Sequence, residues 1–181
     1  MSEGIQRRSL LQRILGGTIA AGLVGLVKAR PAAAAEAPVA VPMLRNVGIA
    51  VADLEKSTKF YTEVFGFKAD PKPMKIGAVL SPLMEVENLD LTIQYIETGS
   101  PVRIELLYFG NPKSTGDGSR HPINTRGLSH WQIRVPDVNA TVAKVKAAGG
   151  TVLENTRFGK PEAPVAIFVL DPDGTRIEVV P

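Results

Sequence analysis

Four residues that can bind a divalent cation or move a proton stand at repeated positions of this chain. They are Asn46, Glu105, His130 and Glu178. In the second half of the chain, His130 and Glu178 occupy the positions that Asn46 and Glu105 occupy in the first half. Carboxylates and imidazole are common proton-transfer groups, and together with amide oxygen they bind divalent metals. Because the chain has no cysteine, thiolate metal sites and a cysteine nucleophile are excluded.

These correspondences belong to an internal repeat. The segment Asn46–Leu54 aligns with His130–Val138 at a constant offset, residue for residue. A later segment, 103–107, aligns with 176–180 at a second, smaller offset. The first copy therefore carries an insertion in its middle. We infer that the chain contains two copies of one structural unit.

Each copy predicts the same order of elements. An alternating strand leads to an aspartate, Asp53 or Asp137, which can cap a helix. An apolar stripe at helical spacing follows, and Gly66 or the Gly149–Gly150 pair ends it. Three more strands are expected in each copy, at 75–86, 89–97 and 102–109 in the first and at 151–158, 165–170 and 175–180 in the second.

The four polar residues all fall on one face of their strands. Side chains alternate between the two faces of a strand, so His130 lies opposite Ile133, and the two glutamates lie opposite the apolar residues that face the helices. If the two sheets curl toward each other, their uncovered faces enclose one cavity that contains all four residues. In an ordinary two-layer α+β protein the same face meets solvent, and polar residues there need no function.

This arrangement resembles the vicinal oxygen chelate superfamily, which includes glyoxalases, bleomycin-resistance proteins and dioxygenases, over residues 43–181. It is most similar to the glyoxalase I and methylmalonyl-CoA epimerase branch. The resemblance rests on Phe60-Tyr61, Gly127-Leu128-Ser129-His130, Gly149-Gly150 and Asp171-Pro172-Asp173-Gly174 before Arg176-Ile177-Glu178.

The resemblance implies an α+β fold in which two tandem βαβββ modules form a cupped mixed sheet. We expect a single domain over 43–181, with module 1 at 43–110, a linker at 111–126 and module 2 at 127–181. The linker is rich in Gly, Pro, Ser and charged residues, and its His121 lies outside the repeated pattern.

The resemblance also implies a metal centre, because family members take ligands from the first and last strand of each module. Carried over, the ligands are Glu105, His130 and Glu178, with Asn46 as a weak fourth ligand where the family usually has histidine or glutamine. Such a set suits Zn²⁺, Ni²⁺, Co²⁺, Mn²⁺ or Fe²⁺. The alternative is a cup that has lost its metal.

The activity implied is that of a lyase, isomerase or epimerase acting on a small oxygenated acid or thioester. The metal would chelate neighbouring oxygens and stabilise an enolate, while Glu105 or Glu178 moves a proton. Three arginines on the same strand faces would favour an anionic substrate. A metal-free binding protein similar to the bleomycin-resistance branch is the alternative, and Asn46 argues against a ring-cleaving dioxygenase, which commonly uses two histidines. A homodimer is left open.

Residues 1–36 have the order of a signal peptide, with Arg7-Arg8 before an apolar run at 14–27. The paired arginines resemble a twin-arginine signal and predict an exported or periplasmic protein, which touches the membrane only through this segment. An uncleaved membrane anchor is the alternative. This segment holds five of the 21 basic and two of the 18 acidic residues, so 16 of each remain, and nucleic-acid binding has no support.

Overall fold

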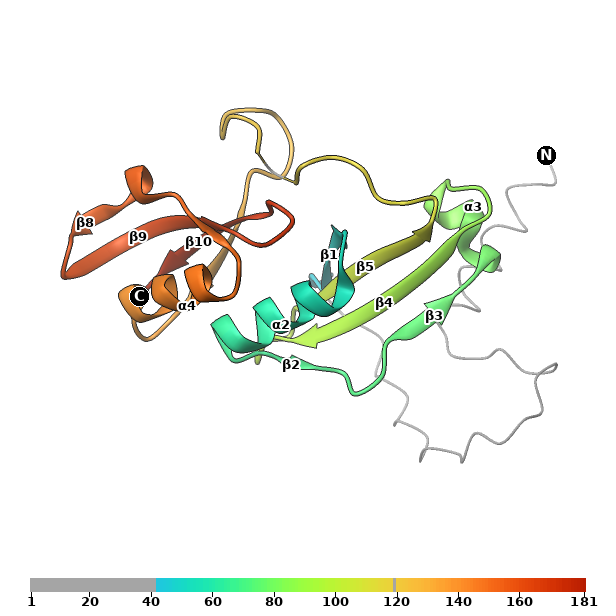
Figure 1. Cartoon of the computed structure of the whole chain (residues 1–181), viewed down its shortest axis with the longest axis horizontal. Helices are drawn as coiled ribbons and strands as arrows, with labels where there is room; N and C mark the ends of the chain where they lie inside the picture. The colour runs from blue at the N-terminus through green and yellow to red at the C-terminus, as the bar shows by residue number, and fades with distance from the viewer. Residues whose placement is uncertain (1–41, 119) are drawn as a thin grey trace. The chain divides into compact units, whose positions relative to one another are not determined.

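The computed structural model describes residues 42–118 and 120–181, of which 43–181 form one compact unit (Figure 1). The predicted signal segment, residues 1–36, lies outside the described residues. Within the described part of the chain, no helix is long and apolar enough to cross a membrane. The strands form two mixed sheets with few helices, so the predicted α+β fold is confirmed.

Module 1 contains one five-stranded sheet and its covering helix. In this sheet β1 runs parallel to β5, and the remaining pairs are antiparallel. The order is β1-β5-β4-β2, and β3 also pairs with β4. The elements are β1 (Asn46–Val51), α2 (Leu54–Phe65), β2 (Lys68–Ala69), β3 (Met74–Ile76), the 3₁₀ helix η1 (Ala78–Leu80), α3 (Ser81–Met84), β4 (Asp90–Glu97) and β5 (Arg103–Asn111).

Module 2 repeats this topology with shorter connections. Its sheet has the order β6-β10-β9-β7, β8 also pairs with β9, and β6 runs parallel to β10. The elements are β6 (Trp131–Arg134), α4 (Val138–Ala147), β7 (Thr151–Val152), the 3₁₀ helix η2 (Glu154–Thr156), β8 (Phe158–Lys160), β9 (Ala163–Leu170) and β10 (Arg176–Val180). Ile104 in β5 and Ile177 in β10 occupy equivalent strands, as the repeat predicts.

The two main helices begin where their caps predict. The carboxylate of Asp53 accepts a hydrogen bond from the backbone N–H of Lys56 at 3.0 Å, and that of Asp137 accepts one from Ala140 at 2.9 Å. Each bond satisfies a backbone donor that the first helical turn leaves free. Gly66 ends α2 with a φ of 71°, a left-handed conformation that glycine adopts without strain.

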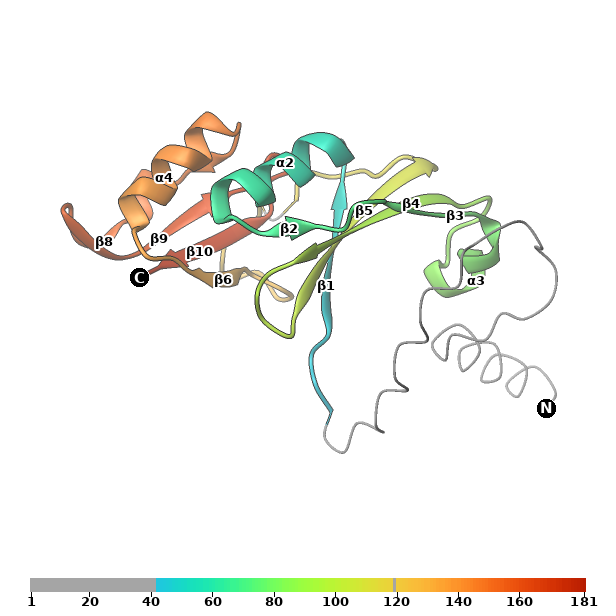
Figure 2. The same ribbon diagram turned by 90° about the horizontal axis from the view of Figure 1, so that it is seen from below.

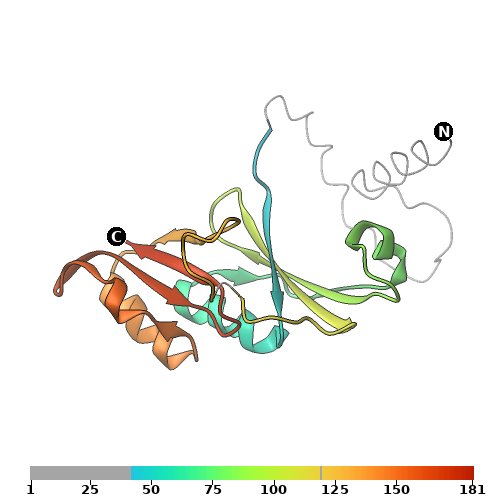
Figure 3. The same cartoon turned by 90° about the horizontal axis from the view of Figure 1, so that it is seen from above.

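Helices α2 and α4 cover the same side of the two sheets, and we call the opposite side the uncovered face (Figures 2 and 3). In module 1, η1 and α3 pack on the far end of that face, against Leu91 and Leu107. The core lies between the helices and the sheets and contains residues of both modules. It includes Ile49, Val51, Phe60, Tyr61, Val64, Ile104 and Leu106 of module 1, and Ile133, Val142, Val145, Ile167, Ile177 and Val179 of module 2.

The prediction of a strand at 75–86 is wrong for most of these residues. Only its first two residues belong to β3, and residues 78–84 form η1 and α3. Pro82 lies in the first turn of α3, where it suits a helix but could not donate to a strand ladder. Leu80 and Met84 instead pack on a small second core around Leu91. The strand predicted at 151–158 is likewise interrupted by η2.

Candidate functional site

The predicted site residues lie in two polar clusters, one on the uncovered face of each sheet. We name the cluster of Asn46, Tyr95, Arg103 and Glu105 half-site 1, and the cluster of His130, Gln132, Phe168 and Glu178 half-site 2. The strand pairing is equivalent in both, since Tyr95 pairs with Glu105 in module 1 and Phe168 pairs with Glu178 in module 2. The two half-sites therefore lie at equivalent positions of the same backbone arrangement.

Half-site 2 holds an imidazole next to a carboxylate. His130 Nε2 lies 3.4 Å from Glu178 Oε2, and both side chains are partly exposed. Gln132 donates a hydrogen bond of 2.8 Å to the same carboxylate oxygen. Ser129 Oγ lies 2.9 Å from His130 Nδ1, and the imidazole and the ring of Phe168 make a T-shaped contact with their centroids 5.1 Å apart. The imidazole is thus held on three sides.

The separation of His130 and Glu178 is informative. At 3.4 Å it exceeds the usual range of an N–H···O hydrogen bond, about 2.7–3.2 Å. Two ligands each about 2.1 Å from one tetrahedral ion are separated by roughly 3.4 Å. The pair therefore has the spacing of two ligands of a single divalent metal, and its donor atoms fit that role.

Half-site 1 is closed by direct hydrogen bonds. Asn46 Nδ2 donates to Glu105 Oε1 at 2.6 Å, and Arg103 Nε donates to Asn46 Oδ1 at 3.3 Å. A carboxylate only accepts and a guanidinium only donates, so this network fixes which end of the Asn46 amide faces each partner. The amide oxygen that was expected to be a weak metal ligand is therefore already occupied by a cation.

Arg103 is well paired in half-site 1. Its Nη1 lies 3.5 Å from a carboxylate oxygen of Glu97, and its guanidinium lies 4.3 Å from the centroid of the Tyr95 ring. Burial, and then the negative charge of Glu105, raise the pKa of the Tyr95 hydroxyl. Tyr95 accordingly stays neutral and can donate a hydrogen bond to Glu105.

The four predicted ligands are not brought together in the single chain. Asn46 meets Glu105, and His130 meets Glu178, but among residues 42–118 and 120–181 no three His, Asp or Glu side chains are positioned to hold a metal. The expectation that one chain gathers all of them in one cavity is therefore wrong for this structure. The physical reason is that each pair is set by strand pairing within its own sheet, and each sheet consists of strands of one module.

Sequence analysis did not assign a role to several half-site residues. Gln132 and Ser129 were given no role at the site, Tyr95 was expected on the core side of its strand, and Phe168 was not considered. The offset that aligns Glu105 with Glu178 also relates Tyr95 to Phe168, so the repeat could have revealed this pair. Ser129 was marked only as part of the Gly127-Leu128-Ser129-His130 motif.

Two cavities lie beside the half-sites. One, of about 360 Å³, is lined by Gly48, the linker residues 114–118 and Trp131. The other, of about 390 Å³, has a mainly apolar lining that includes Gln132, the residue that donates to Glu178. Both volumes suit a small molecule, because ligand pockets commonly measure about 300–1,000 Å³.

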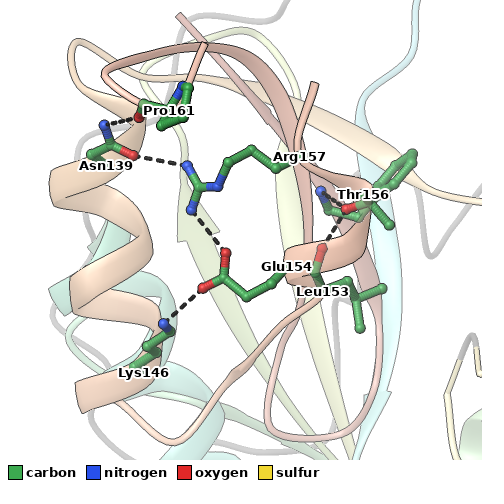
Figure 4. A network of polar contacts seen from close by, with 8 residues as sticks. Asn139, Lys146, Leu153, Glu154, Thr156, Arg157 and Pro161 are labelled. Atoms are coloured by element: carbon green, nitrogen blue, oxygen red, sulfur yellow. Dashed lines mark hydrogen bonds and ion pairs between the residues drawn. The ribbon is translucent and has the colours of Figure 1, made fainter. Parts of the chain in front are cut away.

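A polar network supports the strand that carries Phe168 (Figure 4). Glu154 accepts from Lys146 of α4 at 2.8 Å and from Arg157 at 3.0 Å. Thr156 Oγ1 in the same segment accepts from the backbone N–H of Phe168 at 3.0 Å. The hydrogen bonds from Lys146 and then Arg157 lower the pKa of Glu154. These contacts tie η2 to α4 and hold β9 behind the imidazole of His130.

The fold is that of a known family. The family model for the Glyoxalase/Bleomycin resistance protein/Dioxygenase superfamily matches residues 44–179, and the chain belongs to this family. The chain is similar to a probable lactoylglutathione lyase of Vibrio parahaemolyticus, with 32% identity over 133 residues, 72% of this chain and 83% of the relative. It is also 31% identical over 133 residues to a lactoylglutathione lyase of Haemophilus influenzae, which covers 72% of this chain and 85% of the relative.

Solved structures agree on the fold. A glyoxalase family protein from Bacillus cereus superposes with a TM-score of 0.65 and 19% identity, covering 79% of this chain and 97% of that chain. A trypanothione-dependent glyoxalase I from Leishmania major superposes with a TM-score of 0.55 and 25% identity, covering 77% of this chain and 86% of that chain. The likeness confirms the glyoxalase-like arrangement of the two modules.

Proposed function

We propose that this chain is a metal-dependent lyase that acts on a small oxygenated acyl compound, such as a thioester of a 2-hydroxy acid. One observation carries the proposal: His130 Nε2 and Glu178 Oε2 lie 3.4 Å apart, a separation that two ligands of one tetrahedral ion also have. The relatives named lactoylglutathione lyase support both the lyase reaction and the thioester. An isomerase or epimerase on the same substrate class would use the same groups.

His130 and Glu178 would hold the metal, Glu105 would be a third ligand, and Asn46 would be a weak neighbour. Zinc, nickel, cobalt, manganese and iron all accept such ligands. When bound, the ion would supply positive charge next to the oxygens on which negative charge develops. Because Glu105 lies outside the His130–Glu178 pair, we infer that a homodimer completes the set, with half-site 1 of one copy facing half-site 2 of the other.

The chain's own residues would carry the proton transfer. The reaction breaks the C–H bond next to the thioester carbonyl, and a carboxylate must take that proton and return it to the former carbonyl carbon. The hemithioacetal so formed then breaks its C–S bond, the hydroxyl proton passes to the sulfur, and a free thiol and a 2-oxoaldehyde leave. Glu178 and Glu105 are the candidates. Gln132 donates to Glu178 and Asn46 donates to Glu105, so each carboxylate is oriented by an amide. The partly apolar cavity beside Gln132 would exclude water from the acyl chain.

The test is a metal titration of the purified, chelator-treated chain, followed by an assay for release of free thiol together with an equal amount of a 2-oxoaldehyde from lactoylglutathione. His130→Ala should lower metal affinity by about 100-fold, because it removes a direct ligand. Asn46→His should raise the affinity, because it gives module 1 the imidazole that module 2 has. His121→Ala is the matched control, since His121 is the only other histidine and lies in the linker.

Equal and negligible metal binding by the folded wild type, His130→Ala and Asn46→His would contradict the proposal. Light scattering of the same samples checks the homodimer, which should be present in the active wild type. If the protein binds the metal and cleaves the thioester as a monomer, the lyase proposal stands and the homodimer proposal is contradicted.

A metal-free binding protein is the second candidate function. It is favoured by the closed Asn46–Glu105 pair and by the mainly apolar cavity of about 390 Å³. In that case the wild type would bind apolar small molecules equally well with and without a chelator. Export through the leader at residues 1–36 stays a prediction, and it would place either activity outside the cytoplasm.

A further inference from the structure

The cavity of about 390 Å³ lies between the two modules, at the open edges of their sheets. β1 and β6 are edge strands of the two sheets, and both contribute to its wall. Val47 of β1 and Ile104 of β5 line it from module 1, and Trp131 and Ile133 of β6 line it from module 2. A ligand in this cavity would therefore contact both modules at once.

The body of the cavity faces away from the half-sites. Val47, Ile104 and Ile133 belong to the core on the helix side of the sheets. Neighbouring residues of a strand point to opposite faces, so the half-site residues next to them in sequence point to the uncovered face. Among the described residues, Gln132 is the one half-site residue that lines the cavity. The cavity is therefore a site of its own that touches half-site 2 at one residue.

The cavity offers an apolar surface that the chain leaves open to solvent. Leu44, one of its lining residues, is 64% exposed, and Phe67 and Trp131 are only partly buried. Burial of apolar surface is favourable by about 25 cal/mol per Å². At roughly 30 Å³ per methylene group, about the share of one water molecule, a volume of about 390 Å³ accommodates an unbranched chain of about ten carbons. The size and the lining thus favour an alkyl chain.

The lining carries one positive charge and no negative one. Arg134 of β6 is the cation, and no aspartate or glutamate of the described residues lines the cavity. Arg134 is exposed, and its cross-strand neighbour on β10 is the apolar Val180. Within residues 42–118 and 120–181, no carboxylate forms an ion pair with this guanidinium. The lining therefore matches a ligand that combines an alkyl chain with an anionic group.

The other cavity, of about 360 Å³, has the opposite charge. Its lining includes Asp117 and Asp173 and, among the residues that the structure describes, no lysine or arginine. The repeat accounts for the missing cation, because the residue of β1 that corresponds to Arg134 is Ala50, which lines this second cavity. An anionic ligand would therefore select the cavity of about 390 Å³ over its neighbour.

We propose that the cavity of about 390 Å³ binds a medium-chain fatty acid. The alkyl chain would lie between Val47, Ile104 and Ile133, and the carboxylate would lie at Arg134. This ligand needs neither a metal nor a thioester, so the proposal goes beyond the proposed lyase. Since the lyase substrate would place its acyl chain beside the same cavity, the acid would also compete with that substrate.

Titration of the whole chain with decanoate, in the presence of a chelator, tests the proposal. Trp131 is the single tryptophan of the chain and lines the cavity, so its fluorescence reports the arrival of an alkyl chain. 1-Decanol is the matched probe without a charge. Both probes should shift the emission, and octanoate should bind about tenfold more weakly than decanoate, because it lacks two methylene groups.

Two variants separate the charge from the chain. Arg134→Gln should lower the affinity for decanoate about threefold, the effect of an exposed ion pair, and leave that for decanol unchanged. Arg126→Gln is its control, because Arg126 of the linker lines neither cavity. Leu44→Asp puts a carboxylate at the cavity and should weaken decanoate more than decanol.

Leu128→Asp is the control for Leu44→Asp, because Leu128 is also an exposed leucine, at 69%, but lines the other cavity. It should bind decanoate as the wild type does. Thermal unfolding checks that every variant is folded, and all four substitutions are at exposed positions.

Three results would overturn the proposal. The first is a Trp131 emission that decanoate does not change. The second is an affinity for decanoate that Arg134→Gln leaves intact or lowers no more than that for decanol. The third is a loss in Leu128→Asp as large as that in Leu44→Asp, which would place the acid in the other cavity.

None of these results decides the proposed lyase, because the chelator removes the metal from every sample. The lyase is judged by the metal titration of His130→Ala. If the chain binds metal and cleaves the thioester but does not bind decanoate, the fatty-acid site alone is contradicted.

Discussion

Half-site 1 and half-site 2 have the same backbone geometry and opposite states of their polar groups. In half-site 1 the amide, the carboxylate and the guanidinium are all paired with one another. In half-site 2 the imidazole Nε2 lies 3.4 Å from the carboxylate, and Nη1 of Arg176, two residues before Glu178, is buried without a hydrogen-bond partner among the described residues. The polar groups of module 1 are thus paired with one another, whereas module 2 keeps a buried donor without a partner.

The difference follows from a few substitutions rather than from a change of fold. Asn46 corresponds to His130, and Glu97 corresponds to Leu170. The first exchange replaces an imidazole by an amide that bonds directly to its glutamate, and the second gives the neighbouring arginine a carboxylate. Comparison of repeated units therefore identifies unsatisfied groups that inspection of one unit would not reveal.

The largest expected effect is a difference in unfolding free energy between alanine substitutions at Gly66 and at Gly150, the glycines that follow the two main helices. A methyl group at Gly150 would lie 2.7 Å from the carbonyl oxygen of Leu170 and 2.7 Å from a ring carbon of Phe60, whereas at Gly66 it would meet nothing within 4 Å. Gly150→Ala should therefore lower the free energy of unfolding by about 3 kcal/mol, through overpacking.

Gly66→Ala serves as the comparison and should cost only about 1 kcal/mol, because alanine at a φ of 71° is strained but not crowded. Urea unfolding of both variants measures the difference. If Gly66→Ala proved the more damaging, the close contact at Gly150 would not limit the packing of the two modules.

The next effect concerns a hydrogen bond from a helix residue of module 1 to a residue of module 2, which the repeat does not reproduce from module 2 to module 1. Tyr61 of α2 donates to the buried carboxylate of Asp171 at 2.7 Å, and the residue corresponding to Tyr61 in α4 is Val145. Burial raises the pKa of Asp171, so the stability contributed by this group falls as the pH rises above the ordinary aspartate value of about 3.9. Loss of the tyrosine hydroxyl would raise that pKa further, because the hydrogen bond favours the charged form.

Tyr61→Phe should accordingly cost about 1–3 kcal/mol of unfolding free energy at pH 8 and less at pH 4, where Asp171 is closer to neutral. Denaturant titrations at both pH values provide the measurement. Tyr108→Phe is the control, because its hydroxyl bonds only to the exposed Lys113. A loss that is the same at both pH values would show that the charge of Asp171 is not involved.

The smallest effect compares the outer faces of the helices. Glu154 joins Lys146 of α4 to Arg157, whereas α2 has only the loose pair of Lys59 and Glu63 at 4.0 Å. The lowered pKa of Glu154 means that its stabilisation is present at neutral pH and is lost as the pH falls through that value. Since Glu154 is half exposed, Glu154→Gln should cost less than about 1 kcal/mol at pH 7.

Glu63→Gln is the module 1 counterpart and should leave the melting temperature unchanged. Calorimetric melting of both variants at pH 7 and pH 4 checks the order. Equal shifts of the melting temperature in the two variants would show that the network around Glu154 stabilises the protein no more than the pair of Lys59 and Glu63 does.

Local patterns in the sequence determined most of the fold. Asp53 and Asp137 predicted the helix starts, because capping depends only on residues within one turn. The alternation of β5 and β10 placed Glu105 and Glu178 on the uncovered faces, because side-chain direction in a strand depends only on position along it. The two offsets related the modules without any three-dimensional information.

Sequence reasoning failed where neighbours distant in the chain decide the outcome. Residues 78–84 became helical instead of extended, because they pack on a separate small core around Leu91. Asn46 turned its oxygen to Arg103, and the two half-sites stayed apart, because strand pairing holds each cluster on its own sheet. The burial of Arg176 depends on the linker carbonyl of His121, 55 residues away, and a contact of that range leaves no periodic trace in the sequence.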